Sequence, residues 1–411
     1  MDTALQPGAR YSPAGDHRED PYPFYASARD TEPVFFATQL QMWCVTRYDD
    51  AAAVLADHET FSSRNAIPDN AELGPQVRAV LSEYRQPKTL LNMDRPDHTA
   101  LRRLVQQVFS PRRVAAMEPA VREVTTGLTD QFSGGRADLI DELVYPLPLT
   151  VIFRLLGIPE EDIPLCRQWT GDLKQLLFSG PRLPVARQVQ LARGVAAQQQ
   201  YLDELAAERE TAPGEDLISH LIAAKDTGGN AQLSLSEVSD MTQNLIIGGH
   251  ETLANALGNI LHLVLADPGR WRALREDPAL IEAAVEEGMR ADTGIIGIIR
   301  TATRAVTVGG TDLPAGARLF VMLGSANTDE RRYPDPGQFR LDRTGQPAHL
   351  GLGHGIHYCV GAPLGRLEAR VAVEVLTQRF PGMRPDPDAR LRHLPVPLFR
   401  GFASLPVIWD A

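Results

Sequence analysis

The sequence predicts a mainly α-helical protein with small β-sheet regions, built as a single domain over residues 1–411. Apolar residues recur at helical spacing along much of the chain, including residues 115–225. One helical pattern, 234–266, covers about thirty residues and would span roughly 45 Å, which is too long for a small domain. Runs with β character are short. We therefore expect one large body threaded by a central helix, with about the first fifteen residues disordered.

Composition narrows the function classes. The formal net charge is −11, so a general affinity for nucleic acid is not expected. Three cysteines, Cys44, Cys166 and Cys359, lie far apart, which argues against a disulfide framework or a cysteine-held iron–sulfur cluster. The sequence has neither an apolar run long enough to span a membrane nor a secretory signal pattern. We expect a cytoplasmic protein whose electrons, if it uses any, come from another protein.

The N-terminal region contains the β-like runs. Residues 34–36 and 42–46 are rich in β-branched and aromatic side chains and are expected to pair as a hairpin. Tyr48 then opens an Ala-rich helix, and residues 63–90 have the irregular pattern of a loop around a short helix.

A basic segment follows that loop. His98 and Arg102 are four residues apart, so they share one face of a predicted helix. Two such donors can bind a carboxylate, although a solvated charged face is the commoner meaning of this pattern. Arg102 and Arg103, with Arg112 and Arg113, also form a local basic cluster on an acidic protein. Such a cluster would steer an acidic redox partner.

The long helix has clear boundaries. Ser234 and Glu237 form a capping box at its start, and Asp267-Pro268 stops it. In its middle, Gly248 and Gly249 each cost on the order of 1 kcal/mol relative to alanine. Such a cost indicates a close approach to the backbone or a bulge, and a helix crossing is the alternative.

An acid and an alcohol, Glu251 and Thr252, come directly after these glycines. A threonine can bond to the carbonyl four residues before it and open the helical ladder. If the chain binds an iron ion that has an open coordination position, a Glu–Thr pair beside that position can pass protons to dioxygen. The alternative is that Glu251 simply faces solvent.

Two weaker signals follow. Glu287 and Arg290 are spaced for an ion pair on a helix, which alone indicates no function. The β-branched run 295–299 predicts a strand that leads into Arg300, and the tail 398–409 is expected to form a hairpin.

The most informative stretch is 349–363, where a single cysteine lies among glycines. Gly353, Gly355 and Gly361 allow backbone N–H groups to approach Cys359, and Pro363 suits the first turn of the helix that follows. These donors and the helix dipole favour the thiolate, which is a good axial ligand for iron. Two alternatives are a small buried apolar residue and a zinc cluster with His354 and His357. The zinc reading is weak because no second cysteine pair lies nearby.

The cysteine loop resembles the haem-binding loop of cytochromes P450, Phe-x-x-Gly-x-His-x-Cys-x-Gly. Residues 353–361 match it closely, while Leu352 stands where the family usually has Phe. Residues 248–252 resemble the family's oxygen-activation motif, and Glu287-x-x-Arg290 its Glu-x-x-Arg element. Gly294 stands where the family often has Pro. The matches extend in the family's order from about residue 20 to residue 409.

The resemblance implies haem b (iron protoporphyrin IX) as cofactor, with Cys359 as axial ligand of the iron and Thr252 with Glu251 as a proton relay. Residues implied to contact the haem are His98, Arg102, Arg300, His357, Gly248, Gly249, Leu352, Gly353 and Gly361. Residues implied to line an apolar substrate pocket are Ile246, Ile247, Ile295, Ile296, Ile298, Leu398 and Phe399. Residues implied to stabilise the structure are Glu287, Arg290 and Arg343.

The implied function is that of a haem-thiolate monooxygenase. It would oxidise a largely apolar small molecule, in secondary metabolism or catabolism, with electrons from a separate ferredoxin and ferredoxin reductase. The protein is expected to be a monomer with no membrane or nucleic-acid partner. Two alternatives stay open: a peroxide-driven or non-oxygenating haem-thiolate enzyme, and a non-catalytic haem sensor. The intact Glu251–Thr252 pair argues against the first of these.

Overall fold

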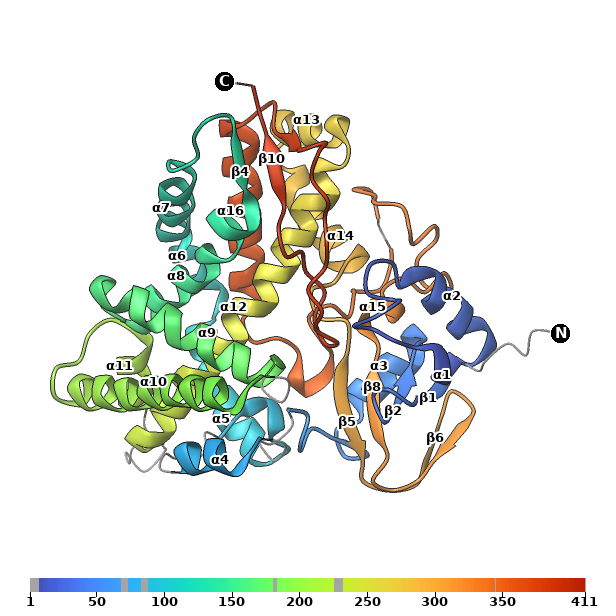
Figure 1. Ribbon diagram of the computed structural model, residues 1–411, viewed down its shortest axis with the longest axis horizontal. Coiled ribbons are helices and arrows are strands. Elements are labelled where there is room, and N and C mark those ends of the chain that lie inside the picture. The colour runs from blue at the N-terminus through green and yellow to red at the C-terminus, as the bar shows by residue number, and fades with distance from the viewer. Residues whose placement is uncertain are drawn as a thin grey trace. The chain divides into compact units, whose positions relative to one another are not determined.

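The computed structural model describes residues 7–67, 73–82, 88–179, 183–224, 232–343 and 345–410. These residues are mainly helical, as predicted (Figure 1). The helices are α1 (Pro7–Arg10), α2 (Tyr22–Thr31), α3 (Tyr48–Ala56), α4 (Pro75–Ser82), α5 (Asp97–Val108), α6 (Pro111–Ala116), α7 (Glu118–Thr129), α8 (Pro146–Leu156), α9 (Ile163–Ser179), α10 (Val185–Thr211), α11 (Leu217–Ala223), α12 (Leu235–Leu265), α13 (Pro268–Glu276), α14 (Leu280–Ala291), α15 (Leu323–Ala326) and α16 (Ala362–Arg379).

The strands are short, in agreement with the sequence. They are β1 (Val34–Ala37), β2 (Met42–Val45), β3 (Phe61–Ser62), β4 (Arg136–Asp138), β5 (Ile298–Ala302), β6 (Val306–Val308), β7 (Thr311–Leu313), β8 (Arg318–Val321), β9 (Arg384–Pro385) and β10 (Pro406–Ile408). None of the described helices is both long and apolar enough to cross a membrane.

The chain divides into two compact units. Unit 1 comprises Met1–Ala66, Val114–Leu147 and Glu251–Ala411, and unit 2 comprises Ile67–Arg113 and Pro148–His250. A single domain over residues 1–411 remains a prediction.

The N-terminal segment is more ordered than the sequence suggested. Tyr11 is fully buried and stacks on Phe24, with their ring centroids 5.0 Å apart. Residues 7–15, which we expected to be disordered, therefore pack in unit 1, because an aromatic side chain anchors them. Residues 1–6 lie outside the described residues.

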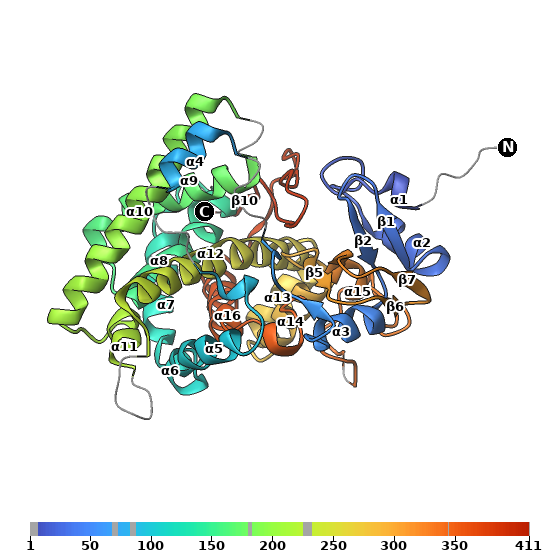
Figure 2. The same ribbon diagram turned by 90° about the horizontal axis from the view of Figure 1, so that it is seen from below.

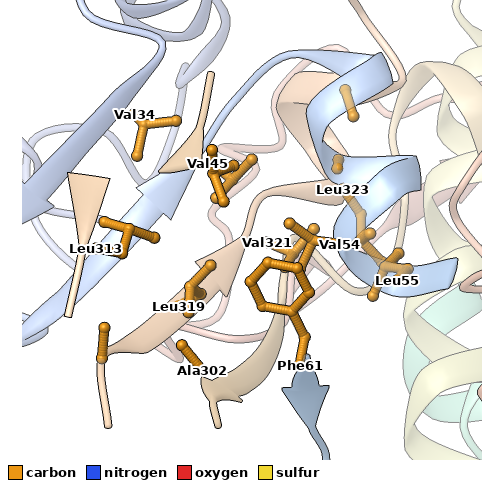
Figure 3. Packing of buried hydrophobic residues seen from close by; sticks show 14 of the residues in the cluster. Val34, Val45, Val54, Leu55, Phe61, Ala302, Leu313, Leu319, Val321 and Leu323 are labelled. Carbon is orange, nitrogen blue, oxygen red and sulfur yellow. The ribbon is translucent and has the colours of Figure 1, made fainter. Parts of the chain in front are cut away.

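The main sheet of unit 1 has the strand order β1-β2-β8-β5-β3. Strands β1 and β2 form the predicted antiparallel hairpin. The other edge of β2 pairs in parallel with β8, so Val45 lies between Val34 and Val321. Figure 3 shows these side chains packed with Val54 and Leu55 of α3. The β-branched and aromatic residues of the strands thus form one core with the helix that follows the hairpin.

Helix α12 begins and ends where the sequence predicts. The amide of Glu237 donates to Ser234 Oγ at 3.3 Å, and the amide of Ser234 donates to Glu237 Oε2 at 3.1 Å, which completes the capping box. Asp267 ends the pattern by capping α13. The α-helix is continuous across Gly248 and Gly249, without a bulge (Figures 1 and 2).

The C-terminal hairpin lies earlier than predicted. Leu394 N donates to Gly401 O, and Ala403 N donates to Arg392 O, so residues 392–403 form the hairpin. Pro395 and Pro397 lie in its turn, where the missing amide donors are tolerated. Strand β10 then pairs with β4 and β9 instead of with the chain around residue 398.

Candidate active site

The cysteine loop, residues 349–361, is closed by its own backbone. Cys359 N donates to Leu352 O at 2.8 Å, and Gly353 N donates to Leu350 O at 2.8 Å. The loop ends where Cys359 O accepts from Ala362 N, the first residue of α16. The cysteine is therefore held in a tight turn directly before a helix N-terminus, as the sequence predicts.

Three glycines of this loop serve different needs. Gly353 and Gly355 have φ angles of +76° and +68°, a conformation that side chains disfavour. A Cβ on Gly355 would also lie 2.4 Å from the carbonyl oxygen of Leu55, so the loop rests directly on the end of α3. A Cβ on Gly361 would lie 3.9 Å from Cys359 Sγ, so glycine keeps the space beside the sulfur open.

Cys359 differs from the other two cysteines in its exposure. Cys44 and Cys166 are buried, and Cys359 is partly exposed. Burial raises the pKa of both buried thiols, that of Cys166 to about 12 with a contribution from Asp162. These two are protonated, inert core residues, which leaves Cys359 as the cysteine that can act as a ligand.

No zinc cluster forms around the loop. Among the residues that the structure describes, no group of three His, Cys, Asp or Glu side chains is arranged to hold a metal ion. The zinc interpretation of His354, His357 and Cys359 is therefore not supported.

Helix α12 carries an accessible stripe in a largely buried helix. Four residues spaced four apart form it: Gly248 is exposed, and Asn244, Thr252 and Ala256 are half-buried. A Cβ built on Gly248 would meet nothing within 4 Å. This face of the helix is thus open at Gly248, one turn before Thr252.

The neighbours of this stripe point elsewhere. Glu251 is 9% exposed and Ile246 is 1% exposed, whereas Ile247 is half-buried. A Cβ on Gly249 would contact Ile152 of α8 at 3.5 Å, so this glycine allows two helices to approach. That contact matches the helix-crossing interpretation of the second glycine.

The strand-like segment after α14 lies against the same part of α12. A Cβ on Gly294 would lie 2.7 Å from Ala256 N and 2.9 Å from Thr252 O. Glycine is therefore needed at this position, since any side chain would collide with the helix backbone.

The hairpin tip pairs with that segment. Ile295 and Phe399 form a β-bridge, and Ile296 N donates to Leu398 O at 3.0 Å. Two half-buried apolar side chains, those of Ile295 and Phe399, are thus brought together in unit 1. Ile296 is 6% exposed and packs in the core with Tyr25 and other aromatic residues, whereas Ile295, Ile298, Leu398 and Phe399 are half-buried. That these five residues line a pocket remains a prediction.

Helix α16 meets α12 beside Thr252. A Cβ on Gly365, in the first turns of α16, would contact Leu253 of α12 at 3.5 Å. Cys359 precedes that turn by a few residues, and Leu253 follows Thr252 directly. The sulfur and the Glu251–Thr252 pair therefore belong to neighbouring segments of unit 1.

The predicted haem-propionate partners are divided between the units. In unit 1, Arg300 is buried and His357 is half-buried, and Arg300 Nη1 donates to Ile299 O at 2.8 Å. In unit 2, His98 is buried and Arg102 is half-buried on the same face of α5.

Glu287 is the centre of a buried ion-pair network. Its two carboxylate oxygens accept from Arg290 at 2.7 Å each, and Oε1 also accepts from Arg343 Nε at 2.8 Å. Arg290 Nη1 reaches Asn327 O, while Asn327 Oδ1 accepts from Leu350 N at 2.6 Å. Burial would raise the pKa of Glu287, but the hydrogen bonds from the two arginines lower it below its usual value. The network thus ties α14 to the start of the cysteine loop.

Two further ion pairs, Asp292–Arg400 and Glu286–Arg366, were not predicted from the sequence. Arg400 donates to Asp292 Oδ1 at 2.7 Å, and Tyr22 donates to the same oxygen at 2.8 Å. Glu286 pairs with Arg366 through both carboxylate oxygens. The partners are 108 and 80 residues apart in the chain, so spacing carries no signal for either pair.

The donor set fits a haem with one protein thiolate ligand. The chain offers an accessible thiol beside a glycine, a helix face kept open by Gly248, and buried or half-buried cationic side chains for carboxylates.

The chain is similar to known proteins along most of its length. The family described as Cytochrome P450 matches residues 183–389. The chain is 38% identical over 408 residues to cytochrome P450 monooxygenase PikC of Streptomyces venezuelae, covering 96% of this chain and 92% of that protein. It is 35% identical over 382 residues to erythromycin C-12 hydroxylase of Saccharopolyspora erythraea, covering 92% of each. The solved P450 haem domain of Tepidiphilus thermophilus superposes with a TM-score of 0.91 at 33% identity, covering 98% of this chain and 97% of that one.

Proposed function

Since this chain belongs to the cytochrome P450 family and is a haem-binding monooxygenase, we propose that it oxidises a largely apolar small molecule with electrons from a separate ferredoxin and ferredoxin reductase. The observation that carries the proposal is the placement in one unit of an accessible cysteine, a Glu–Thr pair and an apolar bridge. These are Cys359, Glu251–Thr252 and Ile295–Phe399.

Haem b, when bound, supplies the iron chemistry that activates dioxygen. The protein's part begins with Cys359, whose sulfur would bind the iron. Cys359 lies in the turn directly before the N-terminus of α16, whose dipole would favour the thiolate. Leu352, Gly353 and Gly361 would contact the haem.

Thr252 and Glu251 would handle protons. The Thr252 hydroxyl lies on the accessible stripe of α12, and the Glu251 carboxyl lies beside it, largely shielded from bulk water. The Glu251 carboxyl and the Thr252 hydroxyl would together relay protons, a role that general acid–base catalysis gives to a positioned pair. Gly248 would leave room for the ring and the substrate.

Four cationic or polar side chains would bind the haem propionates. They are Arg300 and His357 in unit 1 and His98 and Arg102 in unit 2. Charge-assisted hydrogen bonds to carboxylates are roughly twice as strong as neutral ones, which suits an anionic group at a partly buried site.

The substrate is expected to be an apolar natural product. Ile295, Ile296, Ile298, Leu398 and Phe399 in unit 1 and Ile246 and Ile247 in unit 2 would line the substrate pocket, and all are aliphatic or aromatic. A relative hydroxylates erythromycin, so we propose that a macrolide-like product of secondary metabolism is oxidised.

The electron donor would dock on basic side chains. Arg103, Arg112 and Arg113 are exposed on an otherwise acidic chain. A complementary acidic ferredoxin would be steered to them. We propose that the protein works as a cytoplasmic monomer.

The test begins with the purified, haem-loaded protein. A panel of macrolides and other apolar compounds is screened for the low- to high-spin shift, and each binder is incubated with ferredoxin, ferredoxin reductase and NADPH. We expect oxygenated product, and we expect Thr252→Ala to uncouple electron use from product formation. Product formed with peroxide alone, at a rate that Thr252→Ala leaves unchanged, would instead identify a peroxide-driven enzyme. Binding without any turnover would identify a sensor.

A further inference from the structure

The cysteine loop has little regular structure, and its two ends connect to one side chain of α14. Within residues 349–361 the regular structure is a single short 3-10 turn, Gly355–His357. The side chain is that of Glu286, which directly precedes the buried Glu287. Its contacts indicate how the position of the sulfur is maintained.

The first end of the loop contacts Glu286 through His349. The amide of Gly351 donates to His349 Nδ1 at 3.1 Å, so in the neutral ring Nε2 carries the proton. His349 Nε2 lies 3.3 Å from Glu286 Oε2. A Cβ on Gly351 would lie 2.8 Å from Met289 O, so this end of the loop sits directly on α14.

The second end contacts Glu286 through Arg366. Arg366 Nε donates to Oε1 at 2.5 Å and Nη2 donates to Oε2 at 3.0 Å, which is a bidentate pair. The remaining nitrogen, Nη1, donates to the hydroxyl of Tyr358 at 3.0 Å. Tyr358 is the residue immediately before Cys359, so the guanidinium group joins the ligand's neighbour to the carboxylate.

We propose that Glu286 is a positioning residue that clamps both ends of the cysteine loop and thereby holds Cys359 Sγ at the iron. The clamp comprises Glu286, Arg366, His349 and Tyr358. The proposal of this clamp rests on the proposed ligation of haem by Cys359. Because the side chains of Glu286 and Arg366 are 44% and 37% exposed, the pair stabilises the whole fold only weakly. Its effect is concentrated on the loop that it spans.

The experiment follows loss of thiolate ligation separately from unfolding. Haem-loaded wild type, Glu286→Ala and the matched control Glu282→Ala, an exposed carboxylate on the same helix, are reduced under carbon monoxide in sub-denaturing urea. The rate at which the cysteinate absorption band is lost is recorded beside the far-ultraviolet circular dichroism. We expect about a tenfold faster loss in Glu286→Ala, the wild-type rate in Glu282→Ala, and unchanged helix content in both. Tyr358→Phe, which removes the hydroxyl that Arg366 binds, should show a smaller acceleration.

Each outcome decides the proposal. Loss of the band at the wild-type rate in Glu286→Ala overturns the clamp, as does a loss that only parallels global unfolding. If Glu286→Ala does not fold, the Tyr358→Phe rate decides, with acceleration supporting the clamp and the wild-type rate overturning it. A wild-type protein that binds haem without the cysteinate band would refute the proposed ligation itself, and the clamp with it.

Discussion

Two consecutive carboxylates on α14 have opposite surroundings. The side chain of Glu287 is 4% exposed and binds two arginines, whereas that of Glu286 is 44% exposed and binds Arg366 at the edge of the cysteine loop. Breaking a buried ion pair leaves an uncompensated charge and costs about 3–5 kcal/mol, while an exposed pair contributes about 0.2–1 kcal/mol. The same residue type therefore stabilises the fold at one position and acts on one loop at the next.

The strongest test of this contrast removes the buried charge. Glu287→Gln leaves Arg290 and Arg343 without their anion, so the free energy of unfolding should fall by about 3–5 kcal/mol. Urea unfolding followed by circular dichroism measures it, with Glu282→Gln as the exposed control on the same helix. A loss below about 1 kcal/mol would show that Glu287 is no more important than an exposed partner.

Two glycines extend the comparison to packing. Gly294→Ala places a methyl group 2.7 Å from Ala256 N, so it should destabilise the protein by about 1–3 kcal/mol. Gly248→Ala adds a methyl group to open space within a helix and should be neutral or stabilise by up to about 1 kcal/mol. Thermal unfolding of the two variants gives both values. Equal shifts, or shifts of the reverse sign, would mean that the surroundings described for these glycines are incorrect.

A double-mutant cycle addresses the exposed pair. The global unfolding free energies of Glu286→Gln, Arg366→Lys and the double variant should give a coupling energy below about 1 kcal/mol. A coupling of about 3 kcal/mol would place this pair in the same class as Glu287 and remove the distinction between fold and loop.

The C-terminal hairpin and the cysteine loop should lose stability in different pH ranges. Burial and the nearby Arg400 lower the pKa of His393, against Glu19 and Asp292, which raise it. Burial likewise lowers the pKa of His262. The unfolded chain then binds protons first, so hairpin stability falls as the pH drops below about 6.5.

Glu286 also loses its contribution in acid, but only at a lower pH. Burial opposes its ionisation, but His349 and Arg366 lower its pKa to about 2, so its contribution is complete above the ordinary glutamate pKa and is lost only as the pH falls toward 2. Between pH 7 and pH 5, the hydrogen-exchange protection factors of the Leu394 and Ala403 amides, which correct for the slower intrinsic exchange in acid, should fall before those of Gly353 and Cys359. The reverse order would contradict both assignments.

The sequence predicted what depends on neighbouring residues. The capping box of α12, the β1–β2 hairpin and the turn before α16 were predicted because their hydrogen bonds join residues close in the chain. The Glu286–Arg366 and Asp292–Arg400 pairs were not, since contacts between distant segments follow no sequence period. The tail hairpin was misplaced because the predicted range began within its turn.

The most direct test of the account is the absorption spectrum of the ferrous carbon monoxide complex in wild type and Cys359→Ser. The wild-type protein should show the band of cysteinate-ligated haem, and the variant should lack it while retaining its helical circular dichroism. A Cys359→Ser protein that keeps the band would show that another residue binds the iron.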